Sequence, residues 1–269
     1  MRATASKGGF DVRAIGGSHV VLLAIDATKA AREGLLGFAL KRSEAGRNES
    51  YWLKGLKVFR ETVPQPQPGQ RYSTLEHPIQ SFLWGDYSAK PGKTYSFIVR
   101  PVYGGPRNLA YGEDVEVTIS TENEDEGTHA VYFNRGAIAS QAFAERFGSK
   151  GPEDPDDPAD PTTVWLSRGL LEAALHFIDD TRAGETLRVA AYEFSYAPIL
   201  DALEAARQRG VDLIVVYEAG KETVKGKRVD TQATKSNAKA IKAAKLPKAM
   251  LRQRKNRNDI PHNKFMVRL

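Results

Sequence analysis

The hydrophobic pattern of the first half of the chain predicts β-strands. Up to about residue 120, short runs rich in Val, Ile, Leu, Tyr and Phe are separated by clusters of Gly, Pro and Asn. The six runs are HVVLLAID, LLGFALKRSE, YWLKGLKVF, IQSFLWGDY, TYSFIVRPVYG and DVEVTIST. Several short strands with turn residues between them are typical of an antiparallel β-sandwich, which we predict for residues 1–122.

One stretch of this half, AKPGKTYSFIVRPVYG, resembles the corner and following strand of a fibronectin type III domain. A Pro-Gly turn precedes Tyr95, and the residues that follow place Tyr95, Phe97 and Val99 on one face of a strand. The resemblance implies that the Tyr95 hydroxyl bonds back onto the preceding backbone. We interpret Trp52 and Trp84 as core or inter-sheet packing residues, with exposed binding aromatics as the alternative.

The pattern changes after TENEDEG, an acidic stretch where we place a domain boundary. HAVYFNRG predicts a strand and a turn, and AIASQAFAERFG predicts a helix. An acidic, proline-rich segment at residues 151–162 predicts an extended, solvated loop. Then SRGLLEAALHFI, LRVAAYEF, ILDALEAARQRG and VDLIVVYEA predict helix, strand, helix and strand. This order predicts an α/β unit over residues 128–269 with parallel neighbouring strands.

The last eight residues, HNKFMVRL, contain the side chains best suited to chemistry. His262 and Lys264 lie two apart in an apolar run, residues 260–267, of the kind that forms a buried strand. Side chains at i and i+2 leave the same face of a strand, so the imidazole and the ammonium would project together. A nucleophilic nitrogen beside a cation suits attack on a phosphodiester, because negative charge builds on the phosphoryl oxygens. The alternative is that both are ordinary strand residues.

This HxK spacing after a helix–strand–helix–strand run resembles the phospholipase D superfamily, over residues 128–269. The resemblance implies two HxK motifs, from two halves of one chain or from two subunits. One histidine forms a phosphohistidine, the other protonates the leaving oxygen, and the lysines hold the phosphoryl oxygens without a metal or other cofactor. This sequence has one HxK, so a homodimer or a missing C-terminal half would complete the site. The sequence also departs from the family pattern HxKxxxxD, because Leu269 stands where the pattern has Asp.

Glu193 is the third candidate catalytic residue, beside His262 and Lys264. It follows an apolar strand near its carboxyl end, where open α/β sheets place their ligands. A carboxylate there would orient an active-site histidine, or alternatively cap the next helix. Asn134, Arg135 and Ser140, near the first helix of this unit, are candidates for phosphate contact, although local pairing of Arg135 is favoured.

Composition limits the number of domains, the kinds of metal site and the compartment that we expect for this protein. A chain of 269 residues is long enough for two domains, and the absence of cysteine excludes disulfides and thiolate metal sites. No apolar run approaches about 20 residues and no secretory signal is evident, so we expect a cytoplasmic protein without a transmembrane segment. Between residues 221 and 257, 13 Lys and Arg face two acids, a net charge of +11. This basic segment fits a polyanionic substrate, and a solvated helix face is an equal alternative.

Together the patterns predict an α+β multidomain protein. Its antiparallel β-sandwich is fibronectin type III-like, and an incomplete phospholipase D-like α/β domain follows. The implied function is a phosphodiesterase, a nuclease rather than a lipase, because nothing in the sequence suggests a lipid-binding surface. With one HxK motif, residues 1–269 alone are expected to be inactive or nearly so. A non-catalytic module, in which the sandwich binds a protein or glycan, is the second hypothesis.

Overall fold

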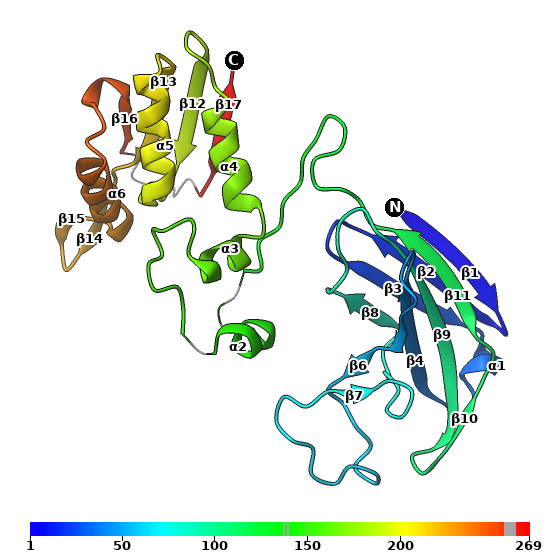
Figure 1. Cartoon of the computed structure of the whole chain (residues 1–269). Helices are drawn as coiled ribbons and strands as arrows, with labels where there is room; N and C mark the ends of the chain where they lie inside the picture. The colour runs from blue at the N-terminus through cyan, green and yellow to red at the C-terminus, as the bar shows by residue number, and fades with distance from the viewer. Residues whose placement is uncertain (137, 139, 149, 256–261) are drawn as a thin grey trace. The chain divides into compact units, whose positions relative to one another are not determined.

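The computed structural model describes residues 1–136, 138, 140–148, 150–255 and 262–269. The chain divides into two compact units, unit 1 (Met1–Val131) and unit 2 (Tyr132–Leu269) (Figure 1). Each unit has its own hydrophobic core. The division falls a few residues after the expected boundary. None of the described helices is long and apolar enough to cross a membrane.

Unit 1 is an antiparallel β-sandwich. One sheet has the order β1-β2-β3-β8, and the other is built on β9, which pairs with β4, β10 and β11, while β5 pairs with β4. A short β6–β7 ladder and a one-turn helix α1 complete the described elements. The bounds are β1 (Arg2–Lys7), β2 (Phe10–Gly16), β3 (Val21–Ala27), α1 (Lys29–Arg32), β4 (Leu35–Glu44), β5 (Ser50–Trp52), β6 (Lys54–Gly55), β7 (Tyr72–Ser73), β8 (Leu83–Asp86), β9 (Thr94–Gly105), β10 (Asn108–Tyr111) and β11 (Val115–Ser120).

The alternation predicted for β9 forms the centre of the sandwich core. Tyr95, Phe97 and Val99 are almost completely buried, whereas the residues between them are half-buried. The Tyr95 hydroxyl accepts a hydrogen bond of 2.9 Å from the backbone amide of Lys90, five residues upstream. This contact confirms the expected tyrosine corner, which fixes the turn into β9 against the core.

The two tryptophans of unit 1 have different environments. Trp84 is partly buried against the core, as predicted. Trp52 lies on the outer face of its sheet, so the prediction of a core position was wrong. The register pairs Trp52 with Lys41, and its ring is also 4.9 Å from the guanidinium carbon of Arg100. Two cations near one ring stabilise the half-buried indole at this position.

The Arg100–Asp114 pair predicts how the stability of unit 1 depends on pH. Arg100 donates to both carboxylate oxygens of Asp114, at 2.6 and 2.7 Å. These bonds hold the pKa of Asp114 below its ordinary value. The pair therefore contributes stability above about pH 3.9 that is lost as pH falls through the lower folded pKa.

We expect Asp114→Asn to lower the free energy of unfolding at pH 7 by about 0.5–1 kcal/mol, because the pair is partly exposed. The variant should lose less stability than the parent between about pH 4 and pH 2. Urea unfolding followed by tryptophan fluorescence at several pH values measures both effects. Parallel pH profiles for the two proteins would contradict the assignment.

Unit 2 contains a four-stranded mixed sheet with the order β16-β13-β12-β17. β12, β13 and β16 are parallel, as expected of βα repeats, and β17 runs antiparallel to β12 at the edge. The helices are α2 (Gln141–Phe147), α3 (Pro161–Ser167), α4 (Leu170–Asp179), α5 (Ala197–Gln208), α6 (Gln232–Ala243) and the 3₁₀ turn η1 (Lys248–Met250). The strands are β12 (Thr186–Ala191), β13 (Asp212–Glu218), β14 (Lys221–Val224), β15 (Lys227–Asp230), β16 (Leu251–Arg254) and β17 (Lys264–Arg268).

One face of this sheet carries the core of unit 2. Leu213 and Val215 of β13 pack with Leu200 and Leu203 of α5, and α6 also contacts β13. Both helices lie in βαβ crossovers that step in the same direction along the sheet, and right-handed crossovers therefore put them on the same face.

The prediction of a buried strand over residues 260–267 was wrong in its limits and in its burial. Residues 260 and 261 lie outside the described residues, and the strand begins at Lys264. Met266 packs into the core, but Phe265 and Val267 are 54% and 40% exposed. They share the other face of the sheet with Val216, which is 38% exposed. β17 is apolar on both faces, yet described residues cover only one of them.

Three further predictions for this half need correction. HAVYF is not a strand: Val131 and Phe133 are 52% and 59% exposed, and the segment has no sheet neighbour in the described chain. The helix predicted for SRGLLEAALHFI begins at Leu170 and not at Ser167, because Arg168 and Gly169 adopt left-handed backbone between α3 and α4. The acidic loop ends two residues early, because the Asp160 side chain caps α3.

Candidate functional site

The carboxyl edge of the parallel strands brings the candidate residues together. β12 ends at Ala191, and residues 192–194 lead from it toward α5. Because β17 is antiparallel to β12, its first residue, Lys264, pairs with Ala191. The start of β17 therefore meets the end of β12 at this edge, where open α/β sheets place their ligands.

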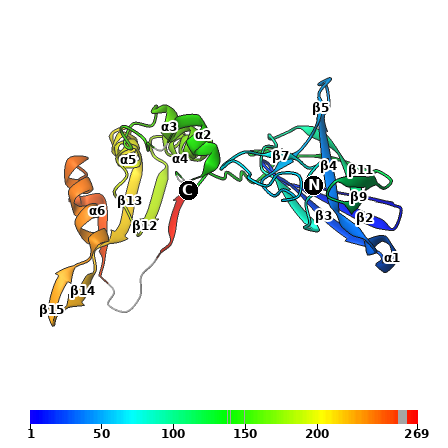
Figure 2. The same cartoon turned by 90° about the horizontal axis from the view of Figure 1, so that it is seen from below.

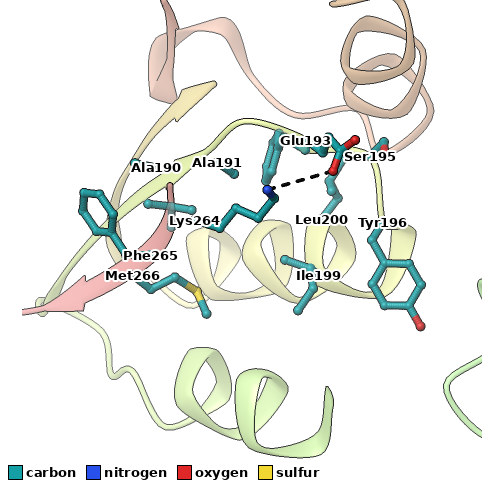
Figure 3. Close-up of a pocket in the computed structure, with 12 residues that line it drawn as sticks. Ala190, Ala191, Glu193, Ser195, Tyr196, Ile199, Leu200, Lys264, Phe265 and Met266 are labelled. Atoms are coloured by element: carbon teal, nitrogen blue, oxygen red, sulfur yellow. Dashed lines mark ion pairs between the residues drawn. The ribbon is translucent and has the colours of Figure 1, made fainter. Parts of the chain in front are cut away.

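The structure brings His262 and Lys264 to the ring of Tyr192, and Glu193 lies beside Lys264. The Lys264 ammonium lies 4.0 Å from a carboxylate oxygen of Glu193, and Figure 3 shows the two side chains pointing toward each other. The His262 imidazole stacks on the Tyr192 ring, with centroids 4.8 Å apart and an interplanar angle of 26°. The Lys264 nitrogen is 5.8 Å from the centre of the same ring.

The reason for this convergence differs from the predicted one. His262 precedes β17 in irregular backbone, so strand alternation does not align it with Lys264. Contact with Tyr192 does so instead, and the Lys264 ammonium also donates a 3.2 Å hydrogen bond to the His262 carbonyl. Both side chains are exposed to solvent. The arrangement offers an accessible imidazole and a cation to an anionic ligand.

Asn237 of α6 forms hydrogen bonds to the backbone at this edge of the sheet, and the sequence analysis did not predict this role. Its side chain is fully buried. The amide oxygen accepts a 2.7 Å hydrogen bond from the Phe194 backbone, and the amide nitrogen donates to the carbonyls of Tyr192 and Glu218 at 2.9 and 3.0 Å. Asn237 thus fixes the peptide groups on both sides of Glu193.

A small pocket of about 210 Å³ lies between β12, β17 and α5, beside the ion pair (Figure 3). Its lining is mainly apolar and includes Val189, Ile199, Leu200 and Met266. Ligand pockets usually measure about 300–1,000 Å³, so this one is small for a substrate. We therefore assign the candidate site to the open edge that carries Glu193 and the basic residues.

A buried carboxylate orders the neighbouring part of the edge. Glu218, at the end of β13, accepts a 2.7 Å hydrogen bond from the Gly220 amide. Its other oxygen lies 3.3 Å from the guanidinium of Arg254 at the end of β16. These contacts tie the carboxyl ends of two parallel strands to each other and hold the start of the chain segment that follows β13.

Ser140 and Arg135, two of the other candidates for phosphate contact, serve local structure, and the backbone carbonyl of Asn134 accepts a 3.2 Å hydrogen bond from Arg168. Ser140 caps α2, and its hydroxyl accepts a 3.2 Å hydrogen bond from the Phe143 amide. The Arg135 guanidinium donates to the Trp165 carbonyl and lies 4.4 Å from the centre of that ring. Among the described residues, no group of three or more His, Asp and Glu side chains is arranged to hold a metal ion.

Comparisons with solved structures find matches of low sequence identity and low TM-score. Similar solved structures include a myokine, at 10% identity over 42% of this chain and 93% of that chain, with a TM-score of 0.28. A computationally redesigned β-sandwich protein is 8% identical over 47% and 96% of the two chains, with a TM-score of 0.29. The fibronectin type III domain of human fibronectin type III domain containing protein 3 is 13% identical over 48% and 92%, with a TM-score of 0.25.

The last two are named as a β-sandwich protein and a fibronectin type III domain. All three TM-scores are 0.29 or lower, too low to assign a family or an activity. No protein-family model matches the chain, and no curated protein matches it. The resemblance of unit 2 to phospholipase D stays a prediction.

Proposed function

We propose that unit 2 is one half of a phospholipase D-like phosphodiesterase site, with His262, Lys264 and Glu193 as its functional side chains. The observation that carries the proposal is that His262 and Lys264 meet at the ring of Tyr192 while Glu193 pairs with Lys264, at the carboxyl edge of the sheet. An imidazole beside a cation, both open to solvent, is the arrangement that phosphoryl transfer to histidine requires.

In this proposal a ring nitrogen of His262 attacks phosphorus, and the bond from phosphorus to the leaving oxygen breaks. A second histidine, from another copy or a further segment, gives the leaving oxygen its proton. The same histidine then removes a proton from water, which attacks the phosphohistidine and releases His262. Lys264 offsets charge on the phosphoryl oxygens, and Glu193, at 4.0 Å, holds the lysine in position.

Trapping the intermediate tests this function. A phosphodiester substrate carrying a phosphorus label, mixed with the protein in chelator and quenched at alkaline pH, should leave the label on His262. Peptide mass spectrometry locates the adduct. We expect His262→Asn to abolish it. The experiment is run on residues 1–269 and on any longer natural product of the reading frame, and an unlabelled His262 in both would reject the proposal.

A binding role for unit 1 is the second candidate. The observation that favours it is the exposure of two large side chains at the edge strand β8: Leu83, its first residue, is 56% exposed, and Tyr87, just after it, is 79% exposed. Single exposed apolar residues are ordinary, but an edge strand also presents unpaired backbone groups to a partner. This candidate predicts that Leu83→Ser with Tyr87→Ser abolishes partner binding and leaves the labelling of His262 unchanged.

A further inference from the structure

A basic hairpin projects from the same edge of the sheet as the candidate site. β14 and β15 follow β13 directly and form an antiparallel ladder, with Lys225 and Gly226 in left-handed backbone at the turn. Figure 2 shows the hairpin extending beyond the end of the sheet toward which β12 and β13 run. Every residue from 221 to 228 is exposed. The hairpin therefore presents both of its faces to solvent.

The tip of this hairpin carries uncompensated positive charge. Lys221, at its base, pairs with Asp230 at 3.6 Å. Lys225, Lys227 and Arg228, around the turn, form no ion pair with any residue in the described part of the chain. A two-stranded hairpin is at best marginally stable alone, and repulsion between three adjacent cations adds to that cost. The cluster is therefore not explained by the stability of the hairpin.

The adjoining helix continues the positive charge. The hydroxyl of Thr234 donates a 2.8 Å hydrogen bond to the Gly220 carbonyl, which joins the start of α6 to the base of the hairpin. Lys235, Lys239 and Lys242 are exposed and lie within about 60° of one another around the helix axis. α6 contains no acidic residue, so like charges at i and i+4 destabilise it without compensation.

The chemistry of this surface selects one class of ligand. A membrane-binding surface combines basic residues with large apolar ones, but Val224 is the large apolar residue exposed on the hairpin. Residues 221–255 include no Phe, Trp or Tyr, so no ring is available there to stack on unpaired bases. What remains is contact with regularly spaced phosphates, which is the sequence-independent mode of binding a duplex.

We infer that the β14–β15 hairpin and the exposed face of α6 bind the backbone of a double-stranded nucleic acid. This inference rests on the proposed function in one respect, because the hairpin would hold the phosphates that flank the one presented to His262 and Lys264. The substrate class is then a polyanion several nucleotides long.

Equilibrium binding of a fluorescein-labelled 20-base-pair DNA duplex to residues 1–269 tests the inference. Substituting Lys225, Lys227 and Arg228 together by Gln should weaken binding at low salt about tenfold or more. It should also reduce the slope of log K against log [NaCl] by about 0.9 for each lost phosphate contact. Gln at Lys239 and Lys242 should lower affinity in the same direction, which gives an independent variant on a different element.

The matched control removes the same charge from exposed lysines of unit 1, at Lys29, Lys54 and Lys57. Its binding should stay within about twofold of the parent, since general electrostatic attraction alone is screened by salt. Equal losses for the two triple variants would overturn the inference, because net charge would then explain the binding. Vesicles of phosphatidylserine that compete with the duplex at the hairpin would overturn the choice of ligand.

His262→Ala separates this inference from the proposed function. The variant should lose the label but still bind the duplex more tightly than the hairpin triple variant, because most of the proposed phosphate contacts come from the hairpin and the helix. Binding by the hairpin without any label on His262 would reject the phosphodiesterase and keep the nucleic-acid surface. If His262 is labelled but the hairpin variants bind the duplex normally, the nucleic-acid surface is rejected and the phosphodiesterase is kept.

Discussion

Replacing Asn237 by alanine should lower the free energy of unfolding of unit 2 by about 2–4 kcal/mol. The side chain is fully buried and makes three hydrogen bonds to backbone groups. Its removal leaves the Phe194 amide and the Glu218 carbonyl without their partner, and each unsatisfied buried group costs about 1–3 kcal/mol. Urea unfolding followed by the fluorescence of Trp165, which belongs to unit 2, measures the loss.

The same substitution should have a local effect at the candidate site. The Phe194 amide should exchange its hydrogen with solvent much faster, because Asn237 is its acceptor. Ser236→Ala, one position earlier, is the control and should change stability by less than about 0.5 kcal/mol. If Asn237→Ala costs less than about 1 kcal/mol and the Phe194 amide stays protected, the loop that carries Glu193 has another support.

Strong local alternation predicted several strands, but not their limits. The buried positions of β9 and the parallel pair β12–β13 could be read from sequence because burial on one or both faces leaves a periodic pattern. β2 was missed, although Phe10, Val12 and Ala14 alternate with residues that are exposed or half-buried. HAVYF was predicted in error because β propensity without a neighbouring strand does not make a sheet.

The candidate site was predictable only as far as topology fixes it. Parallel strands bring their carboxyl ends to one edge, and this argument places Glu193 there. Lys264 reaches the same edge because β17 is antiparallel to β12, whereas the sequence predicted parallel neighbours. The stacking of His262 on Tyr192 depends on the path of residues before β17 and has no local signal. Asn237 lies 43 residues from Phe194 in sequence, so its role emerges only when α6 packs on the sheet.

Substituting His262 by alanine should lower turnover of a phosphodiester by about 10²–10⁴-fold or more in the form of the protein that shows activity. The imidazole is the proposed nucleophile, and proton transfer by a positioned histidine alone contributes that range. Lys264→Met should also reduce kcat/KM, by about 10²–10³-fold, because the charge that develops on the phosphoryl oxygens loses its partner. Hydrolysis measured in chelator gives both values.

The controls for this prediction come from the same sheet. Arg182 is an exposed cation just before β12, at the opposite edge, and Arg182→Gln should leave kcat/KM unchanged. Lys264→Arg keeps the charge but changes its geometry, so it should retain more activity than Lys264→Met. Glu193→Gln removes the 4.0 Å ion partner of Lys264 and should act mainly on kcat, as expected of a positioning residue. Equal losses for Arg182→Gln and Lys264→Met would mean that overall charge, not the site at the carboxyl edge, governs the reaction.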